Sequence, residues 1–250
     1  MTTTPPDVPD ADPPQFRAQP RVAAYLPKTA RGWLASAAAL LYLAGTIGYV
    51  IGARTDGHPG PSSVDVGFLQ DMITHHEQAI EMSNVELAGG EVPDVEAFAR
   101  EILAFQAYEI GVMEGQLAEW GLGPDDRSET AMAWMHQGIT VEQMPGLAAE
   151  DEMSALLQAE GRAVDTLFVP LMQDHHRGGI HMADYAATEA TDPAVRQLAA
   201  RMARNQRIEV GELDAARERA QLDPRPAGYQ PDDIPVSPAP HEGPDEHEGH

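Results

Sequence analysis

The chain has 250 residues, which is enough for one or two domains, and its formal net charge at pH 7 is −24. Nucleic-acid binding needs a basic face, so this acidic composition excludes that class of function. The sequence contains no cysteine, and therefore offers no disulfide, no thiolate metal ligand and no cysteine nucleophile.

The first predicted element is a membrane helix. Residues 1–31 are rich in proline, which predicts a disordered tail. The segment 32–54 carries no charge before its last residue, Arg54, and at ~1.5 Å per residue it is long enough to cross a bilayer. A cleavable signal peptide is the alternative, but the apolar run is longer than a usual signal core and lacks a small-x-small cleavage site. We therefore predict an uncleaved anchor.

The orientation of this anchor follows from its flanking charges. Four basic residues precede the span and one follows it closely: Arg17, Arg21, Lys28, Arg31 and Arg54. The positive-inside rule places the N-terminus in the cytoplasm and the rest of the chain outside. The sequence thus predicts a single-pass protein of the cell membrane with an extracytoplasmic C-terminal domain.

A linker over residues 55–64 leads to a stretch that occurs twice. The motif Phe-x3-Met-x2-His-His-x3-Ile-x-Met begins at Phe68 and again at Phe168. The register then holds without insertion, so that residues 65–121 and 165–221 form two repeats within a predicted domain over residues 65–222. Each repeat has two segments of helical periodicity separated by glycine or proline, which predicts two duplicated helical hairpins.

The helical period places polar side chains on the inward faces. In the first helix of each repeat, the leading histidine lies on the apolar stripe and the second histidine on its edge. The stripe of the second helix is interrupted by a glutamine and a glutamate. A glutamate is rarely buried without a partner, so the histidines and glutamates of the two kinds of helix can satisfy one another. The interrupting residues are Gln106, Glu109, Gln206 and Glu209.

The remaining segments are predicted from local signals. Ser63 or Asp65 is expected to cap the first helix of the domain, and Asp94 the second. The bridge between the repeats, residues 122–150, is rich in methionine; its apolar residues either cover one end of the bundle or form an additional soft metal site. One long helix is predicted from residue 150 to 187.

The C-terminal segment has a composition that cannot form a core. Residues 223–250 are rich in Pro, Asp and Glu, which predicts a disordered acidic tail. Its histidines are either simply solvated or able to collect metal. They are His241, His247 and His250.

With the doubled motif established, the chain resembles the bacterial family called domain of unknown function 305, over about Asp65 to Leu222. The bridge segment Met144-Pro-Gly-Leu and the run Gly161-x3-Asp165-x2-Phe168 are also similar to that family. The resemblance implies an all-α, ferritin-like four-helix bundle that is exported or membrane-anchored. Some members are linked to copper binding and copper tolerance.

The resemblance also carries residues over. Relatives often have alanine where this chain has Gly178 and Gly179, which would weaken the helix locally. The methionine and histidine positions implied as a metal site are Met72, His75, His76, Met82, Met172, His175, His176 and Met182.

The donor types in the repeat favour copper. Di-iron bundles use a Glu-x-x-His motif, but here the first position is Met72 or Met172. Thioether and imidazole suit copper, especially Cu(I), better than iron or manganese, whereas zinc would take the imidazoles but not the thioethers. We therefore expect the four histidines as ligands and these two methionines as supporting thioethers. Glu109 and Glu209 are expected to accept hydrogen bonds from the imidazole N–H groups.

A metal-free interior is the alternative reading of the same residues. Methionine on a helix stripe commonly fills a core, which applies above all to Met82 and Met182. The inward histidines would then form a buried network with Gln106, Gln206 and the two glutamates. His181 has no counterpart in the first repeat and is expected to be exposed.

Three functions follow from these readings. The first is a membrane-anchored, extracytoplasmic protein for copper storage, sequestration or tolerance. The second is a metal-free interaction module outside the membrane. The third is a copper-dependent redox enzyme, which is disfavoured because the sequence supplies no evident substrate pocket or catalytic acid.

Overall fold

The computed structural model describes residues 29–55, 58–124, 126 and 130–234. Within these ranges the chain is helical and has no strand beyond an isolated bridge between Ala131 and Ile139. The chain divides into two units, Met1–Gly57 and His58–His250. Helix α1 belongs to the first unit and all other elements to the second. The helices are α1 (Ala30–Thr55), α2 (Val64–Gly89), α3 (Pro93–Glu119), η2 (Ala133–Met135), η3 (Val141–Gln143), α4 (Glu150–Gln158), α5 (Arg162–Glu189) and α6 (Pro193–Ala220).

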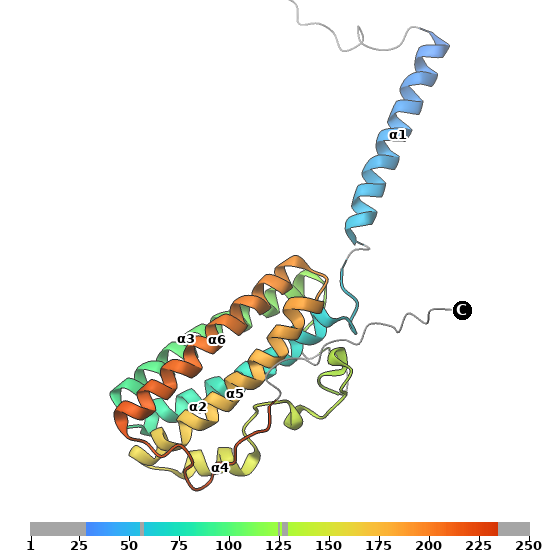
Figure 1. Cartoon of the computed structure of the whole chain (residues 1–250). Coiled ribbons are helices and arrows are strands. Elements are labelled where there is room, and N and C mark those ends of the chain that lie inside the picture. The colour runs from blue at the N-terminus through green and yellow to red at the C-terminus, as the bar shows by residue number, and fades with distance from the viewer. Residues whose placement is uncertain (1–28, 56–57, 125, 127–129, 235–250) are drawn as a thin grey trace, which may run out of the picture. The chain divides into compact units, whose positions relative to one another are not determined.

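Four long helices form the bundle of the second unit (Figure 1). Helices α2 and α3 pack as one hairpin, and α5 and α6 as the other. The hairpins join mainly along α2 and α5, which carry the repeated motif. The prediction of an all-α four-helix bundle built from two duplicated hairpins is confirmed.

Each hairpin supplies a helix cap to the other. Ser63 caps α2, accepting a hydrogen bond from the Val66 amide at 3.2 Å. Asp65 is instead fully buried and accepts from the amides of Thr191 and Asp192, at 3.1 and 2.7 Å, where α6 begins.

The second repeat mirrors this arrangement. Asp165 is also fully buried and accepts from the amides of Glu91 and Val92, at 2.9 and 2.8 Å, where α3 begins. The cap expected from Asp94 is therefore replaced by a carboxylate from the opposite hairpin. An anion at a helix N-terminus is favourable, so both contacts hold the hairpins together.

The bundle core consists of two apolar clusters with a polar layer between them. One cluster combines the start of α2, the end of α3, the end of α5 and the start of α6. The other combines the opposite ends of the same helices. The residues between the clusters on α2 and α5 are the paired histidines.

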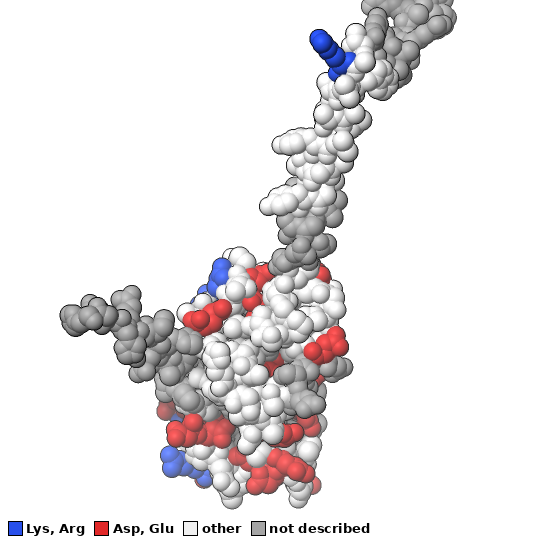
Figure 2. Space-filling model, turned by 90° about the vertical axis from the view of Figure 1, so that its right-hand side faces the viewer, with Lys and Arg blue, Asp and Glu red and all other residues white. Residues whose placement is uncertain are grey.

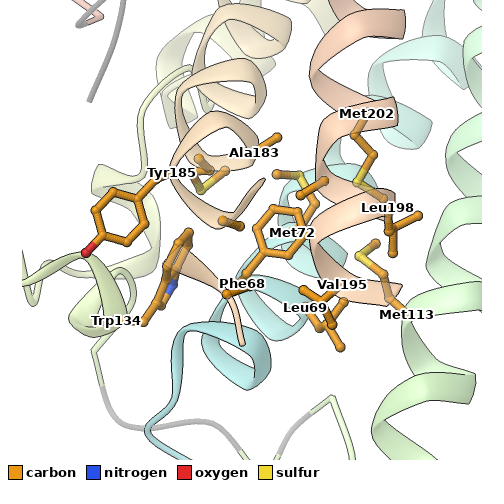
Figure 3. Packing of buried hydrophobic residues seen from close by; sticks show 14 of the residues in the cluster. Phe68, Leu69, Met72, Met113, Trp134, Ala183, Tyr185, Val195, Leu198 and Met202 are labelled. Atoms are coloured by element: carbon orange, nitrogen blue, oxygen red, sulfur yellow. The ribbon is translucent and has the colours of Figure 1, made fainter. Parts of the chain in front are cut away.

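The bridge between the repeats covers the first cluster. Trp134 lies between Phe68 and Tyr185, with ring centroids 5.9 and 5.7 Å away (Figure 3). The Trp134 indole N–H and the Met132 amide both donate to Asp71, each at 2.7 Å. The bridge therefore acts as a cover over one end of the bundle.

The prediction of a single helix from residue 150 to 187 is wrong. The chain breaks after Gln158, where α4 ends, and α5 begins at Arg162. Gly161 has a φ of 59° at the break, in the region that glycine adopts without steric cost.

The predicted disordered tail needs a correction for residues 223–234. Tyr229 donates its hydroxyl to Asp174 at 2.5 Å, and the Asp232 amide donates to the same carboxylate at 3.1 Å. The Gln230 amide bonds Glu152 of α4 at 2.9 Å. These side-chain acceptors hold a proline-rich segment that lacks helical periodicity. Of the tail predicted over 1–31, residues 1–28 lie outside the described residues, and Ala30 and Arg31 already belong to α1. Residues 235–250, with the three tail histidines, also lie outside the described residues.

Helix α1 has the composition expected of a membrane span. The stretch Ala30–Tyr49 has a mean hydropathy of 1.2, and none of it is buried. Helices of this length and composition also occur as signal sequences near an N-terminus. Figure 2 shows this helix as uncharged along most of its length, whereas acidic side chains gather in several groups on the visible face of the bundle.

Candidate metal centre

Four imidazoles lie at mid-height in the bundle, between the two apolar clusters. Helix α2 contributes His75 and His76, and α5 contributes His175 and His176. All four residues have 0% exposure. The second histidine of each pair, expected on the edge of the stripe, is as deeply buried as the first.

The two leading histidines meet face to face. The ring centroids of His75 and His175 lie 3.8 Å apart, with the planes inclined by 37°. Nε2 of His175 lies 2.7 Å from the carbonyl oxygen of His75, and Nε2 of His75 lies 3.1 Å from that of Pro145. A carbonyl oxygen only accepts hydrogen bonds, so both rings carry their proton on Nε2. Each Nδ1 is then left with a lone pair.

The two trailing histidines pair with the glutamates of the other helices. Nε2 of His76 lies 2.9 Å from Oε2 of Glu109, and Nε2 of His176 lies 2.7 Å from Oε2 of Glu209. Both carboxylates are only slightly exposed. The satisfaction of inward histidines by inward glutamates, predicted from the helical period, is therefore present in both repeats.

The Nδ1 atoms of all four imidazoles have no hydrogen-bond partner among the described residues. The side-chain amides of Gln106 and Gln206, 3% exposed, are also without one. The glutamines thus do not join the hydrogen-bond network that the metal-free reading assigned to them. A buried polar atom without a partner costs roughly 1–3 kcal/mol, so such a concentration in one layer requires an explanation.

The protonation state of the leading histidines favours ligand chemistry. Burial lowers the pKa of His75 to about 3, and the neighbouring His76 and His176 add to the decrease. Burial and the adjacent His75 likewise hold the pKa of His175 well below its usual range. Both rings are neutral at physiological pH, and a neutral imidazole is the form that binds a metal.

The methionines of the motif flank the imidazole layer from both sides. Met72 and Met182 belong to the first apolar cluster, and Met172 and Met82 to the second. All four are fully buried. Met72 and Met172 stand one helical turn from the histidines of their own helices, whereas Met82 and Met182 stand almost two turns away.

Among the described residues, the imidazole layer does not bring together the three or four ligands of a zinc or di-iron site. Across the described part of the chain, no three His, Asp or Glu side chains converge as metal ligands. A structural zinc site takes four ligands and a catalytic one three, and di-iron bundles use several carboxylates. Imidazoles assisted by thioethers fit a soft ion such as Cu(I) better.

The bridge contributes to this layer in a way that sequence reasoning missed. The Pro145 carbonyl accepts from His75, and the chain passes so close to α5 that a Cβ on Gly178 would lie 1.8 Å from that oxygen. Gly146 has a φ of 80°, and a Cβ at this position would lie 2.4 Å from the carbonyl oxygen of Asp174 and 3.0 Å from the Cα of His175. Glycine at Gly178, where the family resemblance led us to expect alanine, is the sequence signal for this close approach.

His181 also departs from expectation. It was expected to be exposed but is 3% exposed, and neither ring nitrogen has a hydrogen-bond partner in the described structure. Burial lowers its pKa. The expectation was wrong because the two repeats are not packed alike here: the repeat equivalent, Glu81, is exposed, whereas His181 is buried.

Known structures resemble the same region. A Streptomyces coelicolor protein described as a candidate secreted protein of domain of unknown function 305 is 32% identical; the match covers 67% of this chain and 99% of that one, with a TM-score of 0.62. A fragment of the same family from Deinococcus radiodurans is 26% identical, with 64% and 99% covered and a TM-score of 0.55. The Cu(II)-bound form of a protein called CopM is 27% identical, with 63% and 97% covered and a TM-score of 0.49. No curated protein matches the chain.

The family model described as domain of unknown function 305 matches residues 65–217, which include the first repeat, the bridge and most of the second repeat. This region is more than half of the chain. The protein therefore belongs to the domain of unknown function 305 family, as the doubled motif predicted.

Proposed function

We propose that this protein is a membrane-anchored, extracytoplasmic copper-binding protein, which holds Cu(I) in the imidazole layer for storage or sequestration. One observation carries the proposal: four buried imidazoles have Nδ1 atoms without partners, while carbonyls and carboxylates occupy their Nε2 atoms. Metal-binding histidines typically donate their other ring N–H to a carbonyl or a carboxylate. Thioethers on adjacent turns favour Cu(I).

The proposed roles follow from position in the layer. His75, His76, His175 and His176 are the candidate ligands through Nδ1, and because no three of these side chains converge in the described structure, each copper ion would take at most two of them. Met72 and Met172 add thioethers, whereas Met82 and Met182 lie farther along the helices and fill the core. Glu109 and Glu209 fix the tautomer and orientation of the trailing imidazoles. A bound copper ion would satisfy lone pairs that are otherwise unpaired in the interior.

The test is a Cu(I) competition titration of the full chain in detergent, against a chromophoric chelator under anaerobic conditions. His75→Ala with His175→Ala is expected to lower the affinity at least about 100-fold. Glu109→Gln with Glu209→Gln is expected to lower it about 10–100-fold, as loss of partners that orient metal ligands does. His58→Ala removes an exposed linker imidazole and should change nothing.

Two further variants locate the binding. Met72→Leu with Met172→Leu should weaken Cu(I) binding more than Met82→Leu with Met182→Leu, although all four side chains are equally buried. Replacing the three tail histidines by asparagine should leave the tight site intact. Unchanged affinity after loss of His75 and His175 would contradict the proposed site and point to the tail histidines instead, whereas absence of tight Cu(I) binding by the parent chain would favour the metal-free interaction module.

The proposed topology rests on α1 and on the basic residues that precede it. An alkaline phosphatase fused after His250 should be active in cells, because that enzyme folds only outside the cytoplasm. The chain should also stay with the membrane fraction after alkaline washing. Release of the bundle into the medium would show that α1 is a cleaved signal sequence.

A further inference from the structure

The imidazole of His181 is buried without a partner and lies outside the layer described above. It is 3% exposed, and neither ring nitrogen has a hydrogen-bond partner in the described part of the chain. At about 100° per residue it points roughly 120–140° around α5 from His175 and His176. It therefore faces a different surface of the helix, and the imidazole layer does not explain its burial.

The bridge contacts this face of α5 at two points. Gly178, His181 and Tyr185 are spaced by three and four residues and share one helix face. At one end of the face the Pro145 carbonyl packs against Gly178. At the other end the Trp134 ring lies 5.7 Å from Tyr185. The stretch of the bridge that connects Trp134 to Pro145 therefore starts and ends against the helix face on which His181 lies.

That stretch contributes two buried thioethers. Met135 and Met144 are 7% and 2% exposed, and both belong to the apolar cluster that contains Tyr185 and Met182. A buried imidazole with both nitrogens unpaired and two buried thioethers in the segment that contacts the same helix face are the donor types that select a soft metal ion.

We propose that His181, with Met135 and Met144 of the bridge, forms a second site for a soft monovalent ion, Cu(I) or Ag(I), separate from the layer of four imidazoles. The buried histidine is the nitrogen donor, and the two bridge methionines supply sulfur. The site belongs to the second repeat alone, because the first repeat has the exposed Glu81 at the equivalent position.

The experiment counts Ag(I), a redox-inert probe for Cu(I), bound by the full chain in equilibrium dialysis. His181→Leu is expected to bind one equivalent less than the parent chain. Met135→Leu with Met144→Leu conserves side-chain volume but removes the sulfur, and should lose the same equivalent. The matched control is His136→Asn, which removes an exposed imidazole from the same bridge at a left-handed position that asparagine tolerates.

Thermal unfolding distinguishes this site from a merely structural histidine. Without metal, His181→Leu should unfold at a higher temperature than the parent chain, because two unpaired polar atoms leave the interior. With Ag(I), its midpoint should rise less than that of the parent chain.

The two proposals fail separately. His75→Ala with His175→Ala should retain the equivalent that His181→Leu loses, whether or not the imidazole layer binds metal. An unchanged Ag(I) count in both His181→Leu and the double methionine variant would overturn the second site. An equal loss in His136→Asn would also overturn it.

Discussion

At the residue scale, the absence of a side chain at two glycines of α5 allows close packing next to the imidazole layer. Gly178 lies against the Pro145 carbonyl, which accepts the His75 N–H, and Gly179 lies against the amide of Gln206. Glycine in a helix interior costs about 1 kcal/mol relative to alanine. The two glycines therefore destabilise α5 unless a close approach of other atoms requires them. At Gly178 the neighbouring atom is backbone, which cannot move aside as a flexible side chain could.

We predict that Gly178→Ala destabilises the bundle by about 1–3 kcal/mol, despite its better helix propensity, because the new Cβ would lie 1.8 Å from the Pro145 oxygen. Gly111→Ala and Gly211→Ala are matched controls, since no atom lies within 4 Å of a Cβ at either helical position. They should stabilise by about 0.5–1 kcal/mol. Urea unfolding measures all three, and a stabilised Gly178→Ala variant would exclude the close approach.

At the element scale, the hairpins are joined by two reciprocal caps as well as by apolar packing. Asp65 of α2 binds the start of α6, and Asp165 of α5 binds the start of α3. Each carboxylate lies in the interior at the open N-terminus of a helix from the other repeat. The caps therefore stabilise the pairing of hairpins and not just individual helices.

We predict that Asp65→Ala or Asp165→Ala lowers the free energy of unfolding by about 2–3 kcal/mol, since each removes buried, charge-assisted hydrogen bonds at a helix start. Asp192→Ala is the control. Asp192 caps only its own helix, where its carboxylate accepts from the Ala194 amide, and its loss should cost about 1 kcal/mol. Equal losses in all three variants, measured by denaturant unfolding, would refute a role for the reciprocal caps in hairpin pairing.

At the scale of the whole molecule, a buried carboxyl couples stability to pH. Glu86 near the end of α2 is fully buried, close to Asp165 of α5 and Glu96 of α3. Burial, reinforced by Asp165, raises its pKa from 4.5 to about 9. The folded protein therefore keeps Glu86 protonated at neutral pH. The stability that protonated Glu86 contributes is fully present below the pKa that this carboxyl has in the unfolded chain. It is lost progressively as the pH rises from there towards 9.

Glu86→Gln should remove this dependence, because glutamine resembles the protonated acid but does not ionise. Between about pH 6 and about pH 8, the free energy of unfolding of the parent chain should fall relative to that of the variant. The difference should grow by up to about 1.4 kcal/mol per pH unit. The comparison of the two chains cancels the contributions of the histidines. Parallel stability curves in denaturant titrations across this range would show that Glu86 is ionised in the folded protein.

The sequence by itself determined the elements and most of the polar layer. The doubled motif at a spacing of 100 residues predicted four helices, their inward faces, and the pairing of inward histidines with Glu109 and Glu209; the structure shows that His76 and His176 are the histidines that pair. This was possible because helical periodicity depends on residues three and four positions apart, and because the repeat supplied the same pattern twice.

Only the tertiary structure decided which distant residues complete the hydrogen bonds of the imidazole layer and of the helix starts. The acceptor for His75 lies 70 positions away, and the amides that Asp65 caps lie 126 and 127 positions away. The burial of His181 and the return of residues 223–234 along α4 and α5 left no periodic signal in the sequence. Such contacts depend on where irregular segments pass over the bundle, which is set by packing between distant residues and not by the local preferences of the chain.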